Sequence, residues 1–250
     1  MVPPFQFGKD SYMNIKSTLV FLAALVCGFV VRVGLNQTLN SLPAGNTHGF
    51  AAHQNSIDVQ SNSGVELQRR NTNISWPPVV GHRFPDITLR DTTGTPEQLS
   101  RYAGKVLLIE PIGVACKACQ AFSGGHEIGG AFGHRPQPGL RSIHEYVEHY
   151  GKGASLNDDD IVSIHILFYG NDGRSAPTLE EAQTWSDHFG KHAPRTVFLY
   201  ADQSFVNSQT RSMIPGFLLI DRDFVLRSAA GNPPMADLYR ELIPMIREVL

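Results

Sequence analysis

The chain has 250 residues, 42% hydrophobic and 18% charged, which is a composition typical of a globular protein. Its formal net charge of −2 excludes the excess of Lys and Arg that general binding to nucleic acid or anionic lipid requires. Three cysteines are too few for a disulfide-rich secreted scaffold. Two of them nevertheless form the pair Cys116-Lys117-Ala118-Cys119, a spacing that redox sites and metal sites share.

An apolar segment near the N-terminus predicts a membrane anchor. Residues 17–31, STLVFLAALVCGFVV, carry no charge, and snorkelling of Arg32 extends the apolar stretch to residue 35. Because Lys9 and Lys16 precede it, we expect a transmembrane signal-anchor at 17–35 with residues 1–16 in the cytoplasm. The folded domain would then be extracytoplasmic, in the periplasm. A cleaved signal peptide, giving a secreted protein, is the alternative, although no A-x-A-like cleavage site is evident.

The composition divides the rest of the chain into a tether and a domain. Residues 36–77 are rich in Asn, Gln, Ser, Thr and Gly and show no apolar period, so we predict a flexible linker there. From residue 78 to residue 250, short apolar runs alternate with amphipathic stretches, as in an α/β domain. Strands are predicted at 84–89, 106–109, 161–169 and 196–200, and a hairpin at 217–226. Helices are predicted at 96–104, 140–150, 179–189 and from about 235 onward, with a kink at Pro244, and the glycines of 123–139 indicate an insertion or a broken helix.

The cysteine pair directly follows the apolar strand, at a strand-to-helix junction. Unpaired amides and the positive end of the helix dipole stabilise a thiolate, so Cys116 is the expected attacking thiol. Cys119 lies three positions later on the same face and can resolve a mixed disulfide formed at Cys116. Glu110 ends the apolar run and is either a buried acid that exchanges a proton with Cys119 or an acid at the exposed end of the strand.

A metal site is the main chemical alternative to a redox pair. Copper(I) prefers soft ligands, and it could be held by Cys116, Cys119 and one of His126, His134 or Met213. Zinc would need the same histidines, because the chain has no second CxxC pair. A structural disulfide and two inert thiols are the remaining interpretations of the pair.

Three segments resemble the thioredoxin superfamily, in particular the membrane-anchored TlpA-like and ResA-like thiol-disulfide oxidoreductases of bacterial envelopes. They are GHRFPDITLRDTTG, GKVLLIEPIGVACKAC and IPGFLLIDRDFVLRSAAG, at residues 81–94, 104–119 and 214–231. The resemblance covers roughly residues 80–250. It departs from the family at Ala115-Cys116-Lys117-Ala118-Cys119, where Trp-Cys-x-Pro-Cys is usual.

The resemblance implies an α/β thioredoxin-like fold, a central mixed sheet flanked by helices. It also implies a cis-proline at Pro215 facing the cysteines, a buried acid at Glu110 and no cofactor beyond the redox-active disulfide. The function implied is reduction of disulfides in extracytoplasmic proteins, with a membrane thiol reductase as electron donor. A Sco-like copper metallochaperone and a redox-inactive interaction domain with this fold are the alternatives.

Overall fold

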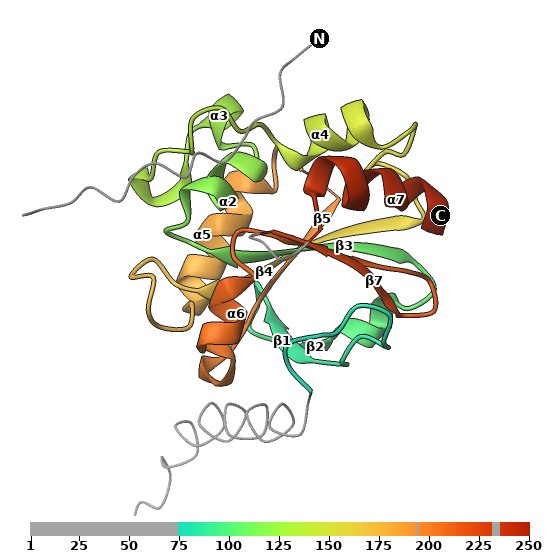
Figure 1. The fold of residues 1–250 in the computed structure, drawn as a ribbon. Coiled ribbons are helices and arrows are strands. Elements are labelled where there is room, and N and C mark those ends of the chain that lie inside the picture. The colour runs from blue at the N-terminus through green and yellow to red at the C-terminus, as the bar shows by residue number, and fades with distance from the viewer. Residues whose placement is uncertain (1–74, 194, 232–235) are drawn as a thin grey trace, which may run out of the picture. The chain divides into compact units, whose positions relative to one another are not determined.

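A computed structural model describes residues 75–193, 195–231 and 236–250 of the chain (Figure 1). The predicted cytoplasmic N-terminus, the predicted anchor at 17–35 and nearly all of the predicted linker lie outside these residues. Within the described ranges, no helix is both long enough and apolar enough to cross a membrane. Packing against the domain begins at Trp76, two residues before the predicted boundary, because its indole N–H donates to the Thr210 hydroxyl at 2.9 Å.

The centre of the domain is a mixed sheet of seven strands in the order β2-β1-β5-β4-β3-β6-β7 (Figure 1). The strands are β1 (Thr88–Asp91), β2 (Pro96–Gln98), β3 (Val106–Gly113), β4 (Ile161–Tyr169), β5 (Thr196–Tyr200), β6 (Phe217–Ile220) and β7 (Leu226–Ala230). Strands β3, β4 and β5 are parallel, and every other pairing is antiparallel. A central strand with a parallel neighbour on one side and an antiparallel hairpin on the other is the core of a thioredoxin-like fold, so the predicted fold is confirmed.

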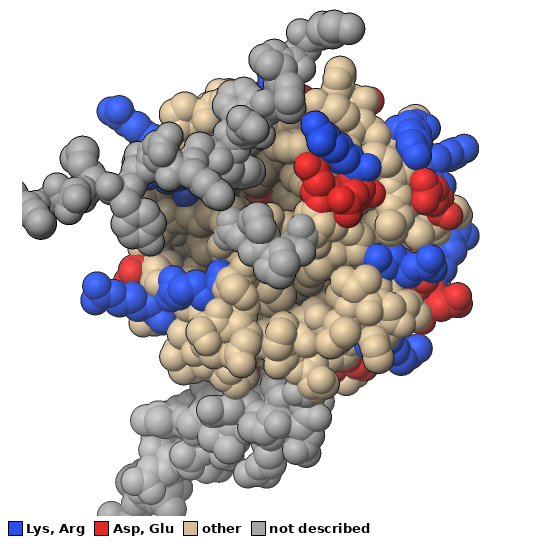
Figure 2. All heavy atoms as spheres, in the orientation of Figure 1, with Lys and Arg blue, Asp and Glu red and all other residues tan. Residues whose placement is uncertain are grey.

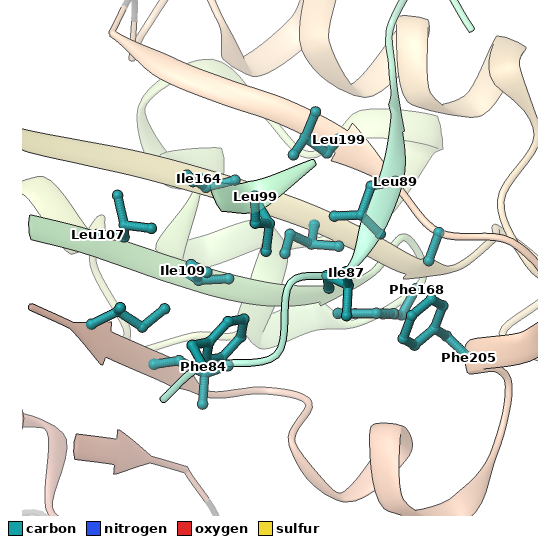
Figure 3. Close-up of a cluster of buried hydrophobic side chains, with 14 of the residues drawn as sticks. Phe84, Ile87, Leu89, Leu99, Leu107, Ile109, Ile164, Phe168, Leu199 and Phe205 are labelled. Atoms are coloured by element: carbon teal, nitrogen blue, oxygen red, sulfur yellow. The ribbon is translucent and has the colours of Figure 1, made fainter. Parts of the chain in front are cut away.

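Helices cover one face of the sheet, and side chains of residues 84–99 pack against the other. The helices are α2 (Lys117–Phe122), α3 (Gly125–Ile128), α4 (Ile143–Tyr150), α5 (Leu179–Phe189), α6 (Ser208–Ser212) and α7 (Ile243–Val249). One face packs against α2, α4 and α7, and further along against α5. The other face forms a cluster with side chains of 84–99 and with Phe205, which Figure 3 shows around Leu107 and Ile109. Strand β3 is buried along its whole length, as expected for a central strand.

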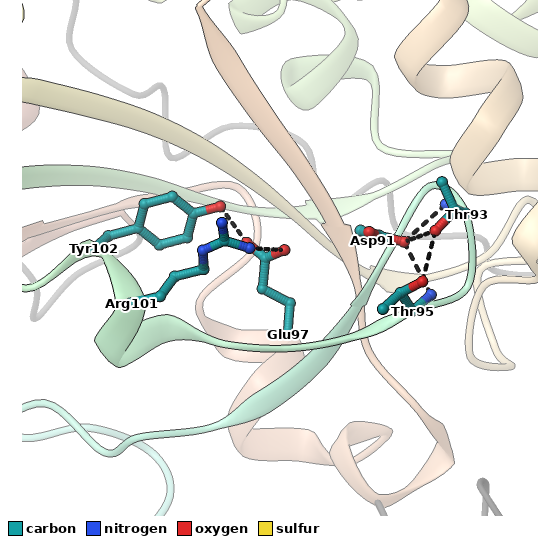
Figure 4. A network of polar contacts seen from close by, with 6 residues as sticks. All are labelled: Asp91, Thr93, Thr95, Glu97, Arg101 and Tyr102. Carbon is teal, nitrogen blue, oxygen red and sulfur yellow. Dashed lines mark hydrogen bonds and ion pairs between the residues drawn. The ribbon is translucent and has the colours of Figure 1, made fainter.

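The predicted helix at 96–104 is wrong, because its first residues form β2. Asp91 Oδ1 accepts hydrogen bonds from the amides of Thr93 and Thr95 at 2.8 and 2.9 Å, which closes a tight turn (Figure 4). The chain then runs back along β1, with Arg90 opposite Pro96. Because β2 is an edge strand, the missing amide hydrogen of the proline costs no ladder bond. Only the 3₁₀ turn Leu99–Tyr102 is helical.

The first predicted strand, 84–89, is also shorter than expected at its N-terminal end. Strand β1 begins at Thr88, and Phe84 instead donates its amide to the carbonyl of Phe224 at 2.7 Å. Pro85 follows at once and has no amide to donate, so regular pairing cannot continue through it. Phe84 is still 2% exposed and belongs to the core.

The antiparallel ladder between β3 and β6 stops before β3 ends. Its last pair is Ile109 with Leu218, although β3 continues to Gly113 alongside β4. Extending the register by two residues would place Pro111 opposite Gly216, next to Pro215. Since neither proline has an amide hydrogen, hydrogen bonding between the two strands ends there. The pairing of β3 with β6 therefore ends before the cysteine pair is reached.

The remaining predicted elements are present, although β3 continues past residue 109, α4 begins at Ile143 and the hairpin ends at Ala230. Strands β4 and β5 have the predicted bounds, and α5 begins with a full capping box between Thr178 and Glu181. The glycine-rich stretch is broken into α2, α3 and a 3₁₀ turn, Ala131–Gly133. The C-terminal helix starts as a π-helical turn, Leu238–Leu242, and becomes α-helical near Pro244, where the kink was predicted. On the face in Figure 2, acidic and basic side chains lie side by side, in line with the near-neutral net charge.

Candidate active site

The two cysteines lie where β3 passes into α2, as predicted. Cys116 is the N-cap residue of α2, and its Sγ accepts a hydrogen bond from the amide of Cys119 at 3.2 Å. Both residues are free thiols. Cys116 is partly exposed, whereas Cys119 is completely buried. The pair therefore has one thiol that a large substrate can reach and one that it cannot.

The surroundings of the two thiols shift their pKa values in opposite directions. Hydrogen bonding from Cys119, from its thiol and also from its amide, lowers the pKa of Cys116 despite partial burial. Burial, and then the hydrogen bond to Cys116, raises the pKa of Cys119 well above its ordinary value. Cys116 is thus the thiol that ionises first, while Cys119 keeps its proton.

Glu110 lies on β3, on the face that α2 and α5 cover. It is 1% exposed, and neither of its carboxyl oxygens has a hydrogen-bond partner among the described residues. Burial, with a smaller effect from Cys116, raises the pKa of Glu110 well above its ordinary value. The expectation of a buried acid is confirmed, and the alternative of an acid at the exposed end of the strand is wrong.

A histidine that the sequence analysis did not single out lies beside Glu110. His165 is the partner of Glu110 in the β3–β4 ladder, and its Nε2 is 3.5 Å from Glu110 Oε2. The indole Nε1 of Trp185, on α5, donates to its Nδ1 at 3.4 Å. Pairing of these strands could have revealed the first contact, but nothing in the sequence indicates the second.

The predicted proline loop lies next to the thiols. The Ile214–Pro215 peptide bond is cis, as the resemblance implied. Ile214 packs against the buried cluster that contains Cys119, and Cys116 packs against the same cluster. A Cβ on Gly216 would be 2.6 Å from two carbonyl oxygens, of Met213 and Ala230, so only glycine fits after the proline. The proline loop and the cysteine pair thus lie beside each other at the end of β3.

The structure does not assemble the ligands predicted for copper or zinc. His126 Nε2 is 2.9 Å from the carbonyl oxygen of Gln137, and His134 Nε2 is 2.6 Å from Asn171 Oδ1. Throughout the described part of the chain, no three His, Cys, Asp or Glu side chains are arranged to hold a metal ion. Met213, the remaining predicted ligand, is buried in the core. Among the described residues, neither histidine is therefore grouped with the two cysteines as a preformed site, and copper binding by Cys116 and Cys119 with one of His126, His134 or Met213 stays a prediction.

Gln120 is a second site residue that the sequence analysis missed. It is completely buried one residue after Cys119, and its amide Nε2 donates to the carbonyl of Val114 at 2.8 Å. Its Oε1 accepts the amide hydrogen of Ala131 at 2.7 Å. One side chain thus joins the turn before the cysteines to the glycine-rich insertion. A polar residue between Cys119 and Ala121 in a short helix gave no signal of this role.

No family model and no curated protein matches the chain. Solved structures do resemble it. A candidate thiol-disulfide oxidoreductase from Bacteroides vulgatus is 21% identical, with 70% of this chain and 100% of that chain covered and a TM-score of 0.42. Arabidopsis thaliana ScoI with copper bound is 13% identical, with 68% and 99% covered and a TM-score of 0.43. A candidate thiol:disulfide interchange protein DsbE from Chlorobium tepidum is 13% identical, with 68% and 96% covered and a TM-score of 0.40.

The class of the protein follows from its own topology and site. The cysteine pair comes directly after β3, the strand that pairs in parallel with β4 and antiparallel with β6, and the cis-proline loop precedes the β6–β7 hairpin. Together with the buried acid on the central strand, these features define a thioredoxin-fold protein with a dithiol site. The expected resemblance to the thioredoxin superfamily is thus confirmed.

Proposed function

We propose that this protein is a thiol-disulfide oxidoreductase that reduces disulfides of extracytoplasmic proteins through Cys116 and Cys119. The observation that carries the proposal is the difference between the two thiols. The partly exposed Cys116 Sγ accepts an amide hydrogen bond that stabilises its thiolate, whereas the buried Cys119 stays protonated three residues away. An attacking and a resolving thiol need this division of properties.

The reaction proceeds by two exchanges. The Cys116 thiolate attacks one sulfur of the substrate disulfide, a mixed disulfide forms, and the first substrate thiolate leaves. Cys119 then loses its proton and attacks Cys116 Sγ, which releases the second substrate thiolate and leaves a Cys116–Cys119 disulfide. The substrate gains the two electrons that the dithiol loses. Glu110 is the buried group suited to accept the Cys119 proton, because its charge acts on Cys119 and neither of its oxygens has a hydrogen-bond partner among the described residues.

The proposed location and electron supply rest on the sequence. In this proposal the uncharged run 17–31 anchors the domain on the outer side of the membrane. A membrane thiol reductase then returns two electrons to the Cys116–Cys119 disulfide. In the TlpA-like and ResA-like manner, the linker at 36–77 lets the domain reach its substrates near the membrane.

The test is a redox titration of the full-length chain by thiol trapping in glutathione or dithiothreitol buffers. The chain carries Cys27→Ser, so that only two thiols are counted. We expect a reversible two-electron couple near or below about −200 mV, the range of reducing thioredoxin-fold proteins. A couple near about −120 mV would instead make the protein an oxidant.

Two variants serve as controls for this titration. Cys116→Ser and Cys119→Ser each leave a single thiol and must abolish the couple. If the unsubstituted pair forms no reversible disulfide, the oxidoreductase function is wrong and the fold serves another role.

A further inference from the structure

Three buried polar side chains form a line between α5 and the central strand. Trp185 Nε1 is 3.4 Å from His165 Nδ1, and His165 Nε2 is 3.5 Å from Glu110 Oε2. All three residues are at most 2% exposed. The steps of thiol exchange given above use Glu110 but not the other two residues.

The indole determines which nitrogen of the imidazole carries the hydrogen. Trp can only donate, so Nδ1 of His165 must be the acceptor. In a neutral imidazole the hydrogen is then on Nε2, the nitrogen that faces Glu110. Burial lowers the pKa of His165 to about 3, so the ring is neutral at physiological pH. His165 therefore presents an N–H donor, and not a positive charge, to the carboxyl group.

Few other polar groups lie near the carboxyl group of Glu110. The ring of Phe198 packs edge-on against His165 at 5.2 Å and supplies no polar atom. The other titratable groups that act on this pair are His144 on α4, whose own pKa burial lowers, and the two cysteines on and before α2. None of the described residues makes a hydrogen bond to either oxygen of Glu110. His165 Nε2–H is thus the donor best placed to approach it.

We propose that His165 is a positioning residue for thiol exchange, which the Trp185 indole holds as an N–H donor so that Glu110 can accept and return the proton of Cys119. This inference rests on the proposed function. Oε2 faces the Nε2–H in both protonation states of the acid, which leaves Oε1 to carry the proton. Because a carboxylate accepts a stronger hydrogen bond than a carboxylic acid does, the contact favours the form of Glu110 that acts as a base.

The proton and electron balance of the assisted step is simple. The Cys119 S–H bond breaks and its proton moves to Oε1 of Glu110, while the Cys119 thiolate attacks Cys116 Sγ. The Cys116–Cys119 bond forms, the bond from Cys116 to the substrate sulfur breaks, and the substrate leaves as a thiolate. Glu110 then returns its proton to solvent or to the departing thiolate, and His165 neither gains nor loses one.

The experiment follows the two exchanges separately in the full-length Cys27→Ser chain. Reduced protein is mixed with the aromatic disulfide dithiobis(nitrobenzoate), and release of coloured thionitrobenzoate is recorded by stopped flow across a pH series. The first phase reports attack by Cys116, and the second phase reports attack by Cys119 on the mixed disulfide. The variants are His165→Leu, His165→Gln and Glu110→Gln, together with the double variant of Glu110→Gln and His165→Leu.

His165→Leu is expected to raise the pH midpoint of the second phase by about one to two units, because the N–H donor that faces the charged form of Glu110 at 3.5 Å is lost. At pH values below the midpoint the second phase should slow about tenfold to a hundredfold, and the first phase should stay within about twofold. His165→Gln keeps an N–H donor and should restore most of the rate. In the Glu110→Gln background, His165→Leu should slow the second phase no further.

Three results would overturn the role of His165. They are a second phase that His165→Leu leaves unchanged, an equal slowing in the Glu110→Gln background, and a midpoint in His165→Gln as high as in His165→Leu. The glutamine variant decides the matter if the leucine variant does not fold. Absence of a second phase in the unsubstituted chain would instead refute thiol exchange itself, so the two failures are distinguishable.

Discussion

Replacing Gln120 by methionine would break the link between the active-site turn and the glycine-rich insertion. Methionine has nearly the same length and a similar helix propensity, so packing and local structure change little. The two backbone groups that Gln120 satisfies, the carbonyl of Val114 and the amide of Ala131, would stay buried without a partner. The perturbation is therefore the loss of two buried hydrogen bonds.

The expected cost follows from those two groups. A buried polar group left unsatisfied costs about 1–3 kcal/mol, so the variant should lose about 2–6 kcal/mol of unfolding free energy. This is a large share of the roughly 5–15 kcal/mol that stabilises a typical domain. A matched control is Gln183→Met on α5, where an exposed glutamine makes one hydrogen bond, to the carbonyl of Thr92 at 3.0 Å. That change should cost no more than about 0.5 kcal/mol.

Urea unfolding of the full-length chain under reducing conditions provides the measurement. The signal is the fluorescence of its two tryptophans, of which Trp185 is completely buried and Trp76 packs against Phe168 and Phe205. A loss below about 1 kcal/mol for Gln120→Met, or a loss equal to that of Gln183→Met, would refute the reasoning. It would mean that water or a local shift satisfies the two backbone groups.

Three further predictions concern charge, capping and thiol reactivity. Because its pKa is raised, Glu110 stays protonated to a higher pH in the native state than in the unfolded state. Its contribution to the unfolding free energy is therefore complete below about pH 4.3 and is lost as pH rises through the native pKa. As pH rises, the urea concentration at half-unfolding should therefore fall for the unsubstituted chain relative to Glu110→Gln. An equal dependence on pH in the two chains would contradict this. Thr178→Ala removes the capping box of α5 and should lower the unfolding free energy by about 1 kcal/mol in the same assay, whereas no loss would argue against the cap. Iodoacetamide followed by mass spectrometry should label Cys116 in the native protein, and Cys119 only after unfolding; equal native labelling would disprove the burial of Cys119.

The elements predicted correctly are those whose signal is contained in one stretch of sequence. Continuous apolar runs gave β4 and β5 their bounds, and the Thr178 to Glu181 spacing marked the start of α5. The helix predicted at 96–104 was wrong because Thr95-Pro96-Glu97-Gln98 suits both the start of a helix and an edge strand after a turn. The strand forms because the carboxylate of Asp91 accepts hydrogen bonds from the amides of Thr93 and Thr95, which closes the turn and aligns β2 with β1.

The chemistry of the site was predictable only in part, for a related reason. The cysteine spacing and the acid at the end of an apolar run are local features, so Cys116, Cys119 and Glu110 could be found. His165 acquires its role from strand register and from Trp185, twenty positions further along the chain. Gln120 acquires its role from Ala131, across a loop. Contacts of this kind depend on tertiary packing, which no periodicity in the sequence records.

The early end of the β3–β6 ladder has a consequence for how this protein could diversify. The ladder ends between Pro111 in β3 and the proline loop before β6, and neither of these lies in the glycine-rich residues 123–139. Replacements in residues 123–139 therefore leave the pairing of β3 with β6 unchanged. Such replacements must keep an amide at the position of Ala131, which donates to Gln120 Oε1, and glycine at 125 and 130, where a Cβ would meet backbone atoms.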